Sequence, residues 1–162
     1  MNVALTEDAE QDISQTTSKD IRLSAMNLLA RREHSRRELQ EKLGRRFEHS
    51  RLISSVLAQL EEDGLLSDQR YSEAYINGRA NKLYGPERIK QELRQAGIDD
   101  QLIELTLDES GIDWQERLRQ LKQKKFGNMP ITGIEERAKQ QRFFQYRGFS
   151  NELIRQLDKS NR

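Results

Sequence analysis

The stretch Gly97-Ile-Asp-Asp-Gln-Leu-Ile103 predicts the end of one helix and the start of the next. Glycine readily adopts the left-handed conformation that ends a helix, and aspartate is a favoured cap at a helix start. The isoleucine after the glycine can cover the turn, while Leu102 and Ile103 can bury against the preceding helix. The same order recurs in Gly148-Phe-Ser-Asn-Glu-Leu-Ile154, with serine in the capping position. The recurrence indicates a repeated helical unit.

A looser copy of the pattern lies nearer the N-terminus, where Phe47 is followed by Leu52-Ile53 with one extra residue between. Apolar residues spaced three and four apart predict helices along the chain, whereas strand signals are nearly absent. We therefore predict an all-α fold of three tandem three-helix repeats. Their expected bounds are 20–67, 68–111 and 112–162, behind a disordered acidic tail over 1–19.

Helix starts are marked by three sequences of the capping-box type, in which a small polar residue precedes a glutamate by three positions. They are Ser35–Glu38, Asp113–Glu116 and Thr132–Glu135. Ser50 is expected to cap a further helix. Gly85-Pro86 predicts another start, because proline at the first helical position gives up an N–H that has no partner there.

The amino-acid composition fits small helical units, each of which buries only a narrow apolar stripe. Of 162 residues, 34% are hydrophobic and 34% charged, which is polar for a globular protein. Units that each bury one narrow apolar stripe against a neighbour have such a composition. The chain has no apolar run long enough to cross a membrane and no secretory signal, so we predict a cytoplasmic protein.

The sequence contains no pattern of residues that indicates catalysis. The chain has no cysteine, and its two histidines, His34 and His49, lie on different predicted elements. Neither thiolate chemistry nor a zinc site is therefore expected. No phosphate-binding loop is present, because the loop between Gly127 and Gly133 lacks the Lys-Ser that would follow it. We predict a protein that is not an enzyme and needs no cofactor or metal.

The net charge of +1 averages opposed segments, since an acidic lead precedes basic stretches at 21–60 and 117–125. Basic runs of this kind are either solvated helix faces or binding surfaces for an anionic partner, and the sequence leaves both open. Phe126, Tyr71 and Tyr75 are more easily explained as packing residues. The candidate binding residues in the two basic stretches are Arg31, Arg32, Arg36, Arg37, Arg45, Arg46, Arg117, Arg119, Lys122, Lys124 and Lys125.

Three strings in this chain resemble the RecX family of bacterial proteins, which regulate the RecA recombinase. They are Leu28-Leu-Ala-Arg-Arg-Glu-His-Ser-Arg-Arg-Glu-Leu39, Gly64-Leu-Leu-Ser-Asp-Gln-Arg-Tyr71 and Arg142-Phe-Phe-Gln-Tyr-Arg-Gly-Phe-Ser150. The resemblance spans roughly Ile21 to Leu157. It adds Arg70, Tyr71, Arg79, Arg142 and Arg147 to the candidate binding residues.

The resemblance implies an elongated, curved molecule that lodges in the groove of the RecA–single-stranded DNA filament. It implies inhibition of the ATPase, strand-exchange and co-protease activities of RecA. Single-stranded DNA and duplex DNA are expected to bind more weakly, and we expect a monomer.

Two other hypotheses remain open at this stage. A free-standing DNA-binding protein could use the helix over 50–60 as a helix-turn-helix reader, presenting Arg51, Ser54, Ser55 and Gln59 to bases. Alternatively, the chain is a helical adaptor whose charges are all solvated and whose partner is another protein.

Overall fold

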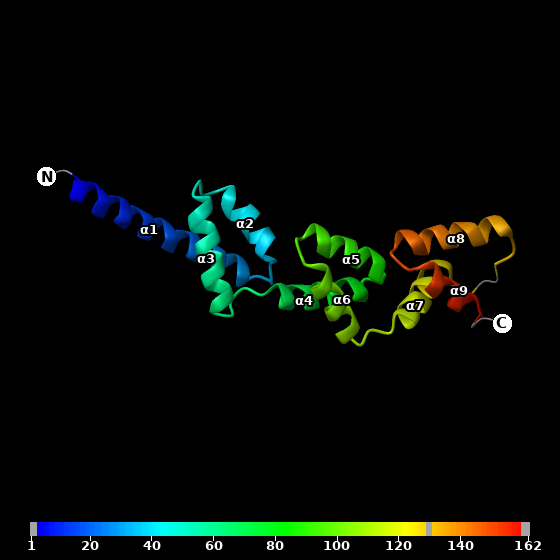
Figure 1. The fold of residues 1–162 in the computed structure, drawn as a ribbon. Coiled ribbons are helices and arrows are strands. Elements are labelled where there is room, and N and C mark those ends of the chain that lie inside the picture. Colours follow the sequence, from blue (N-terminus) through cyan, green and yellow to red (C-terminus); the bar gives the residue numbers. More distant parts are fainter. Residues whose placement is uncertain (1–2, 129–130, 160–162) are drawn as a thin grey trace. The chain divides into compact units, whose positions relative to one another are not determined.

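The computed structural model describes residues 3–128 and 131–159, and every regular element in them is a helix (Figure 1). The prediction of an all-helical chain is confirmed. The helices are α1 (Val3–Leu29), α2 (Arg36–Gly44), α3 (Ser50–Glu62), α4 (Asp68–Asn81), α5 (Pro86–Gln95), α6 (Asp100–Glu109), α7 (Trp114–Phe126), α8 (Ile134–Tyr146) and α9 (Asn151–Lys159). Among the described residues, no helix is both long and apolar enough to span a membrane.

Helix α1 begins at Val3, and the expected disorder of the lead over 1–19 stays a prediction. Residues 1–29 contain neither glycine nor proline. A helix nucleated where Ile21 and Ala25 are fully buried can therefore extend backward without interruption. The residue bounds expected for the three repeats stay a prediction.

The chain divides into two compact units, residues 1–71 and 72–162, which we call unit 1 and unit 2. In unit 1, α1, α2 and α3 pack on one another. Their apolar stripes meet in a core that Leu66 completes after α3. The buried residues of this core are Ile21, Ala25, Leu39, Leu43, Ile53, Val56, Leu57, Leu60 and Leu66.

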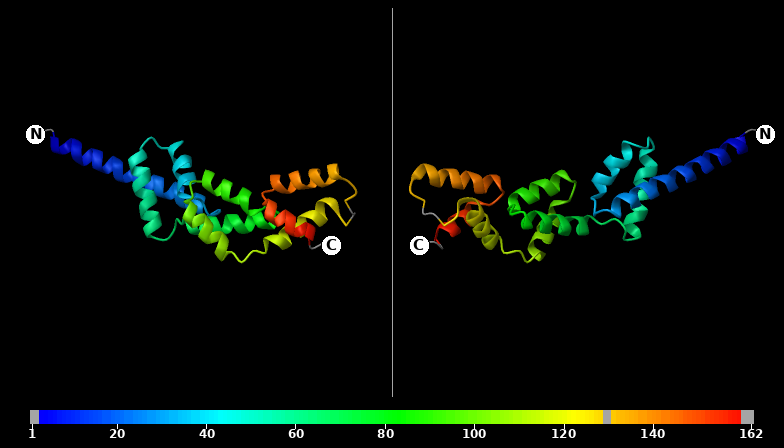
Figure 2. Two further views of the ribbon diagram at one scale, coloured as in Figure 1. Left: turned by 45° about the vertical axis from the view of Figure 1, so that its right-hand side comes forward. Right: turned by 180° about the vertical axis from the view of Figure 1, so that it is seen from behind.

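Unit 2 contains α5 to α9 and most of α4, shown from two further directions in Figure 2. Helix α5 packs on α6, and α9 packs on both α7 and α8. The buried core around α9 is formed by Leu83, Leu118, Leu121, Phe144, Phe149, Ile154 and Leu157. Phe126 is half-buried against this core, which agrees with its expected packing role.

The residues that end helices and cap the next ones follow the repeat pattern. Gly97 and Gly148 have φ angles of 82° and 96°, in the left-handed region that favours glycine. The Asp99 carboxylate accepts a hydrogen bond from the Gln101 N–H at 2.9 Å, and Ser150 Oγ accepts one from the Leu153 N–H at 3.3 Å. Each turn thus satisfies a backbone donor that the following helix leaves free.

Of the three predicted capping boxes, two have the expected serine or aspartate cap. Ser35 Oγ accepts from the Glu38 N–H at 3.1 Å, and an Asp113 oxygen accepts from the Glu116 N–H at 2.9 Å. The Thr132–Glu135 box is wrong, because Gly133 holds the capping position without a side-chain bond. The prediction for Ser50 is also wrong, since this residue is the first of α3 and His49 precedes it as the cap. Both errors are shifts of one residue at a helix start.

Candidate nucleic-acid and partner interface

In unit 1, the arginines around the start of α2 are bound to carboxylates of the same unit. Arg32 pairs with Glu38 at 3.0 Å, Arg36 with Glu61 at 2.5 Å, and Arg37 with Glu41 at 3.1 Å. All of these side chains remain partly exposed. The sequence leaves open whether these arginines are balanced within the chain, and the structure supplies a carboxylate partner for each of the three.

Arg70 and Tyr71 connect the start of α4 to the loop before α2 and to α2 itself. Arg70 Nε donates to Glu33 Oε1 at 2.9 Å. Tyr71 is buried, and its hydroxyl lies 3.5 Å from Glu38 Oε1. The Arg36 N–H donates to the carboxylate of Asp68 at 2.8 Å. These contacts join residues more than 30 positions apart, so they stabilise the fold of unit 1.

His34 lies buried in the same loop. Its Nδ1 is 3.0 Å from the carbonyl oxygen of Arg32, and its Nε2 is 3.1 Å from the ammonium of Lys42. A neutral ring fits both neighbours, because Nδ1–H then donates to the carbonyl and Nε2 accepts from the ammonium. Burial lowers the pKa of His34, and the positive charges of Arg32 and Lys42 act in the same direction.

Other predicted cations have no carboxylate within ion-pair distance in the part of the chain that the structure describes. In unit 1 these are Arg31 and Arg45, while Arg46 lies over the ring of its neighbour Phe47 at 5.4 Å. In unit 2 they are Lys122, Lys124, Lys125 and Arg142. By contrast, Arg119 pairs with Glu116 at 2.9 Å, and Arg117 donates to the side-chain oxygen of Asn81 at 3.2 Å.

The remaining predicted residues, Arg79 and Arg147, meet in unit 2 around Tyr84. The guanidinium carbons of Arg79, Arg88 and Arg147 lie 3.9, 4.8 and 4.1 Å from the centre of the Tyr84 ring. We call these three arginines with Tyr84 and Glu92 the arginine–tyrosine cluster. A cation over the face of an aromatic ring is attracted by the ring quadrupole.

Glu92 on α5 is the carboxylate of this cluster. It accepts hydrogen bonds from both Arg79 and Arg88, and from the Tyr75 hydroxyl at 2.8 Å. Burial alone would raise the pKa of Glu92, but the hydrogen bonds from Arg79, Arg88 and Tyr75 outweigh burial and lower it to about 2. Two guanidinium groups thus bind a single carboxylate, and that of Arg147 shares the Tyr84 ring with them, which leaves the cluster with an excess of positive charge.

Two backbone hydrogen bonds next to the cluster join the turn before α5 to the turn after α8. The Gly85 N–H donates to the carbonyl of Arg147 at 2.7 Å, and the Glu87 N–H donates to the carbonyl of Gly148 at 3.0 Å. A Cβ atom on Gly85 would collide with the backbone of Gly148, and one on Gly148 would collide with Arg88. Only glycine permits this approach, which places Arg88 and Arg147 against the same ring.

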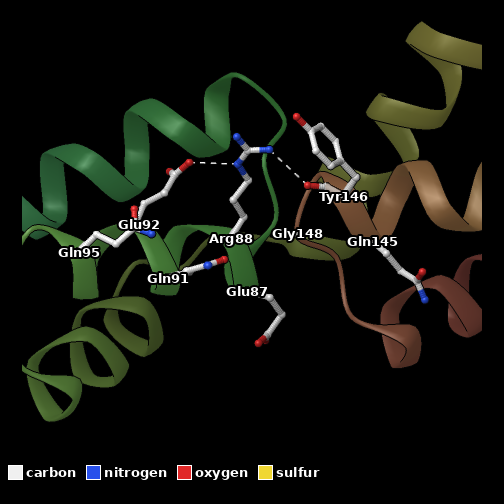
Figure 3. Close-up of a pocket in the computed structure, with 8 residues that line it drawn as sticks. All are labelled: Glu87, Arg88, Gln91, Glu92, Gln95, Gln145, Tyr146 and Gly148. Carbon is white, nitrogen blue, oxygen red and sulfur yellow. Dashed lines mark hydrogen bonds and ion pairs between the residues drawn. The ribbon is translucent and has the colours of Figure 1, made fainter.

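A pocket of about 420 Å³ opens beside the cluster, between α5 and the end of α8 (Figure 3). It is lined by Glu87, Arg88, Gln91, Glu92, Gln95, Gln145, Tyr146 and Gly148. Figure 3 shows Arg88 bonded to Glu92 on one side and to the main chain of Tyr146 on the other. No group of histidine, aspartate and glutamate side chains suited to a metal ion occurs within the described ranges.

Sequence reasoning missed four residues of this site: Tyr84, Arg88, Glu92 and Tyr146. One available signal was the spacing of Arg88 and Glu92, which places them on one face of a helix. Another was the string over 142–150, which contains both Tyr146 and Arg147. Of the sixteen candidate residues predicted from the sequence, the structure brings only Arg79 and Arg147 to this site.

Most of the chain is similar to known proteins of one family. A family model described as RecX, second three-helix domain, matches residues 67–107, and one described as RecX, third three-helix domain, matches residues 112–157. A regulatory protein RecX from Pseudomonas fluorescens strain Pf-5 is 48% identical over 137 residues, covering 85% of this chain and 88% of the relative. Another from Pseudomonas savastanoi pv. phaseolicola is 49% identical over 137 residues, with the same coverage.

Two crystal structures are similar in fold. That of RecX from Lactobacillus salivarius has a TM-score of 0.73 at 25% identity, covering 87% of this chain and 96% of that one. A crystal structure of a regulatory protein RecX has a TM-score of 0.74 at 23% identity, covering 93% of this chain and 77% of that one.

Proposed function

Because this chain belongs to the RecX family of regulatory proteins, we propose that its target is the filament that RecA forms on single-stranded DNA. The family resemblance seen in three strings of the sequence is thereby confirmed. RecX proteins are non-enzymatic regulators, so the chain acts by binding. Under this proposal, binding inhibits the ATPase, strand-exchange and co-protease activities of RecA.

Family membership is the observation that carries the proposal, and the unpaired cations support it. Arg31, Arg45, Lys122, Lys124 and Arg142 have no carboxylate partner among the described residues. A cation without an internal partner can neutralise a phosphate and release its counterion, which favours binding to a DNA-containing filament. Under the proposal, the same cations bind free single-stranded and duplex DNA more weakly.

The proposal includes a monomer that acts in the cytoplasm. Unit 1 and unit 2 each have a hydrophobic core of their own, so neither requires a second copy of the chain to bury one.

A titration of RecA ATPase activity tests the proposal. RecA is first assembled on single-stranded DNA until ATP hydrolysis is constant, so that the DNA is fully coated, and the protein is then added in increasing amounts. We expect the rate of hydrolysis to fall at ratios of protein to RecA at or below one. A rate that stays constant at every ratio would refute the proposal.

Competition for free DNA must be distinguished from an effect on the filament. A matched titration with a second, non-specific single-stranded DNA-binding protein of similar affinity serves as the control. If both proteins lower the rate equally, sequestration of DNA explains the effect and the RecA filament is not the target. Strand exchange and co-protease assays on the same samples should decline in parallel with ATP hydrolysis.

A further inference from the structure

Tyr146 presents an exposed aromatic ring at the end of α8. Tyr146 as a whole is 71% exposed to solvent, whereas Phe144, two positions earlier, is buried in the core. The backbone that carries the ring is held by Arg88, because the main-chain carbonyl of Tyr146 accepts from this arginine at 3.3 Å. Arg88 also lies 5.1 Å from the ring centre. An aromatic side chain held in place loses little conformational entropy when a ligand stacks on it.

Cations precede Tyr146 on the same helix face. Arg142 lies four residues before it and Lys139 lies seven before, so the three side chains follow one another along α8. Both cations are exposed and have no carboxylate within ion-pair distance in the described ranges. With a rise of about 1.5 Å per residue, they are displaced along the helix by about 6 and 10 Å from Tyr146.

The pocket beside Tyr146 suits a neutral, hydrogen-bonding ring. Gln91 and Gln95 line it from α5, and their amides have no hydrogen-bond partner among the described residues. Within the lining, the carboxylates of Glu87 and Glu92 outnumber the one guanidinium of Arg88, so the lining itself does not favour an anion. No aliphatic side chain is among its lining residues, so it is poorly suited to the apolar side chains that anchor peptides. A nucleobase has both a face for stacking and polar edges for amide groups.

We propose that Tyr146 and this pocket form a base-stacking site for single-stranded nucleic acid. One base stacks on the face of the Tyr146 ring that Arg88 does not cover. Gln91 and Gln95, on the other side of Arg88, offer their amides to the polar edge of a neighbouring base (Figure 3). The neighbouring phosphates lie along α8 against Arg142 and Lys139, outside the pocket and away from its two carboxylates. Aromatic platforms beside a basic track are the general means of binding single strands without sequence preference. This inference rests on the proposed function, because it takes the DNA of the filament as the ligand.

The test compares a thymidine oligonucleotide with an abasic oligonucleotide of the same length and charge, each labelled and measured by fluorescence anisotropy at low salt. Replacing Tyr146 with alanine should weaken binding of the thymidine oligonucleotide by about five- to hundredfold. It should leave binding of the abasic oligonucleotide unchanged. Tyr146→Phe, which keeps the ring, should retain the affinity of the wild type for both.

Arg142→Gln serves as the matched control for charge. It should weaken both oligonucleotides equally and reduce the slope of log affinity against log salt by about one. Circular dichroism establishes that each variant keeps its helices, which is expected because both side chains are exposed.

The inference is overturned if Tyr146→Ala binds the thymidine oligonucleotide as the wild type does, or weakens both oligonucleotides equally. If Tyr146→Ala binds DNA normally but no longer inhibits RecA, the ring contacts protein and the base-stacking site is wrong, while the proposed function stands. The opposite result is also informative. If binding of the thymidine oligonucleotide depends on Tyr146 but the wild-type protein never affects RecA, the stacking site is supported and the proposed function is contradicted.

Discussion

The two units use arginine differently. In unit 1, Arg32, Arg36 and Arg37 each pair with a different glutamate, and the pairs are partly exposed. In unit 2, Arg79 and Arg88 bind the same Glu92, while Arg147 joins them on the Tyr84 ring. The first arrangement cancels charge locally and the second concentrates it. An arginine-rich stretch therefore does not by itself indicate a binding surface, because the distribution of carboxylates decides how much charge remains for a partner.

The largest expected effect comes from the backbone beneath the cluster of unit 2. In Gly85→Ala, the added Cβ would collide with the backbone of Gly148, which cannot move aside without breaking the bonds between the two turns. We expect the free energy of unfolding to fall by about 3 kcal/mol. Chemical denaturation followed by circular dichroism measures it.

Gly78→Ala is the matched control, because no atom lies within 4 Å of a Cβ at this position inside α4. Alanine is the better helix former, so this variant should gain about 0.5–1 kcal/mol. Equal effects of the two substitutions would show that the close approach of Gly85 and Gly148 contributes nothing to stability.

Removing the shared carboxylate should have the next largest effect. Glu92→Gln leaves three clustered arginines without a counter-charge, so we expect a loss of about 2 kcal/mol of unfolding free energy. The control in unit 1 is Glu61→Gln, which breaks only the exposed pair with Arg36 and should cost less than about 1 kcal/mol. Similar losses from both variants would contradict the distinction between the two units.

Acidification should affect unit 1 before unit 2. The pKa of His34 is lowered from 6.5 in the folded chain, so the unfolded chain binds the proton more readily. The stability that depends on a neutral His34 is complete above pH 6.5 and declines as the pH falls from there toward the folded-state pKa. The pKa of Glu92 is lowered from 4.5 to about 2, so its contribution is complete above pH 4.5 and declines between pH 4.5 and 2.

Hydrogen exchange resolved by residue, measured from pH 7 downward and corrected for intrinsic exchange rates, follows each unit separately. Protection in the core of unit 1 should decrease as the pH falls below 6.5, while unit 2 stays unchanged. In His34→Gln the decrease should disappear. If unit 2 loses protection at a higher pH than unit 1 does, the expected order of the two units is contradicted.

The sequence predicted local features of the fold better than its surfaces. The turn at Gly148 and the cap at Ser150 were found because a helix end depends on a few adjacent residues. The bond between Arg88 and Tyr146 joins residues 58 positions apart, and the bond from Arg147 to Lys82 joins residues 65 apart. Helical periodicity indicates which face of one helix is buried, but it does not indicate which turn of another helix lies against it.

The same limit explains the assignments in unit 1. The sequence predicts Arg36 as a binding residue because it lies in a crowded run of arginines, yet its partner Glu61 lies 25 positions later on α3. Arg142, which the resemblance pointed to, has no such partner in the described residues. Only the folded arrangement distinguishes an arginine bound to its own chain from one available to another molecule.

The central claim is that the unpaired cations contact the partner and the paired ones maintain the fold. Its most direct test is the affinity of two variants of equal net charge for the RecA–single-stranded DNA filament. One replaces the unpaired Arg31, Arg45, Lys124 and Arg142 with glutamine, and the other replaces the paired Arg32, Arg36, Arg37 and Arg70. We predict that the first variant loses affinity at unchanged melting temperature, whereas the second keeps its affinity and melts earlier. Equal losses of affinity, or a greater loss in the second variant while it remains folded, would contradict the claim.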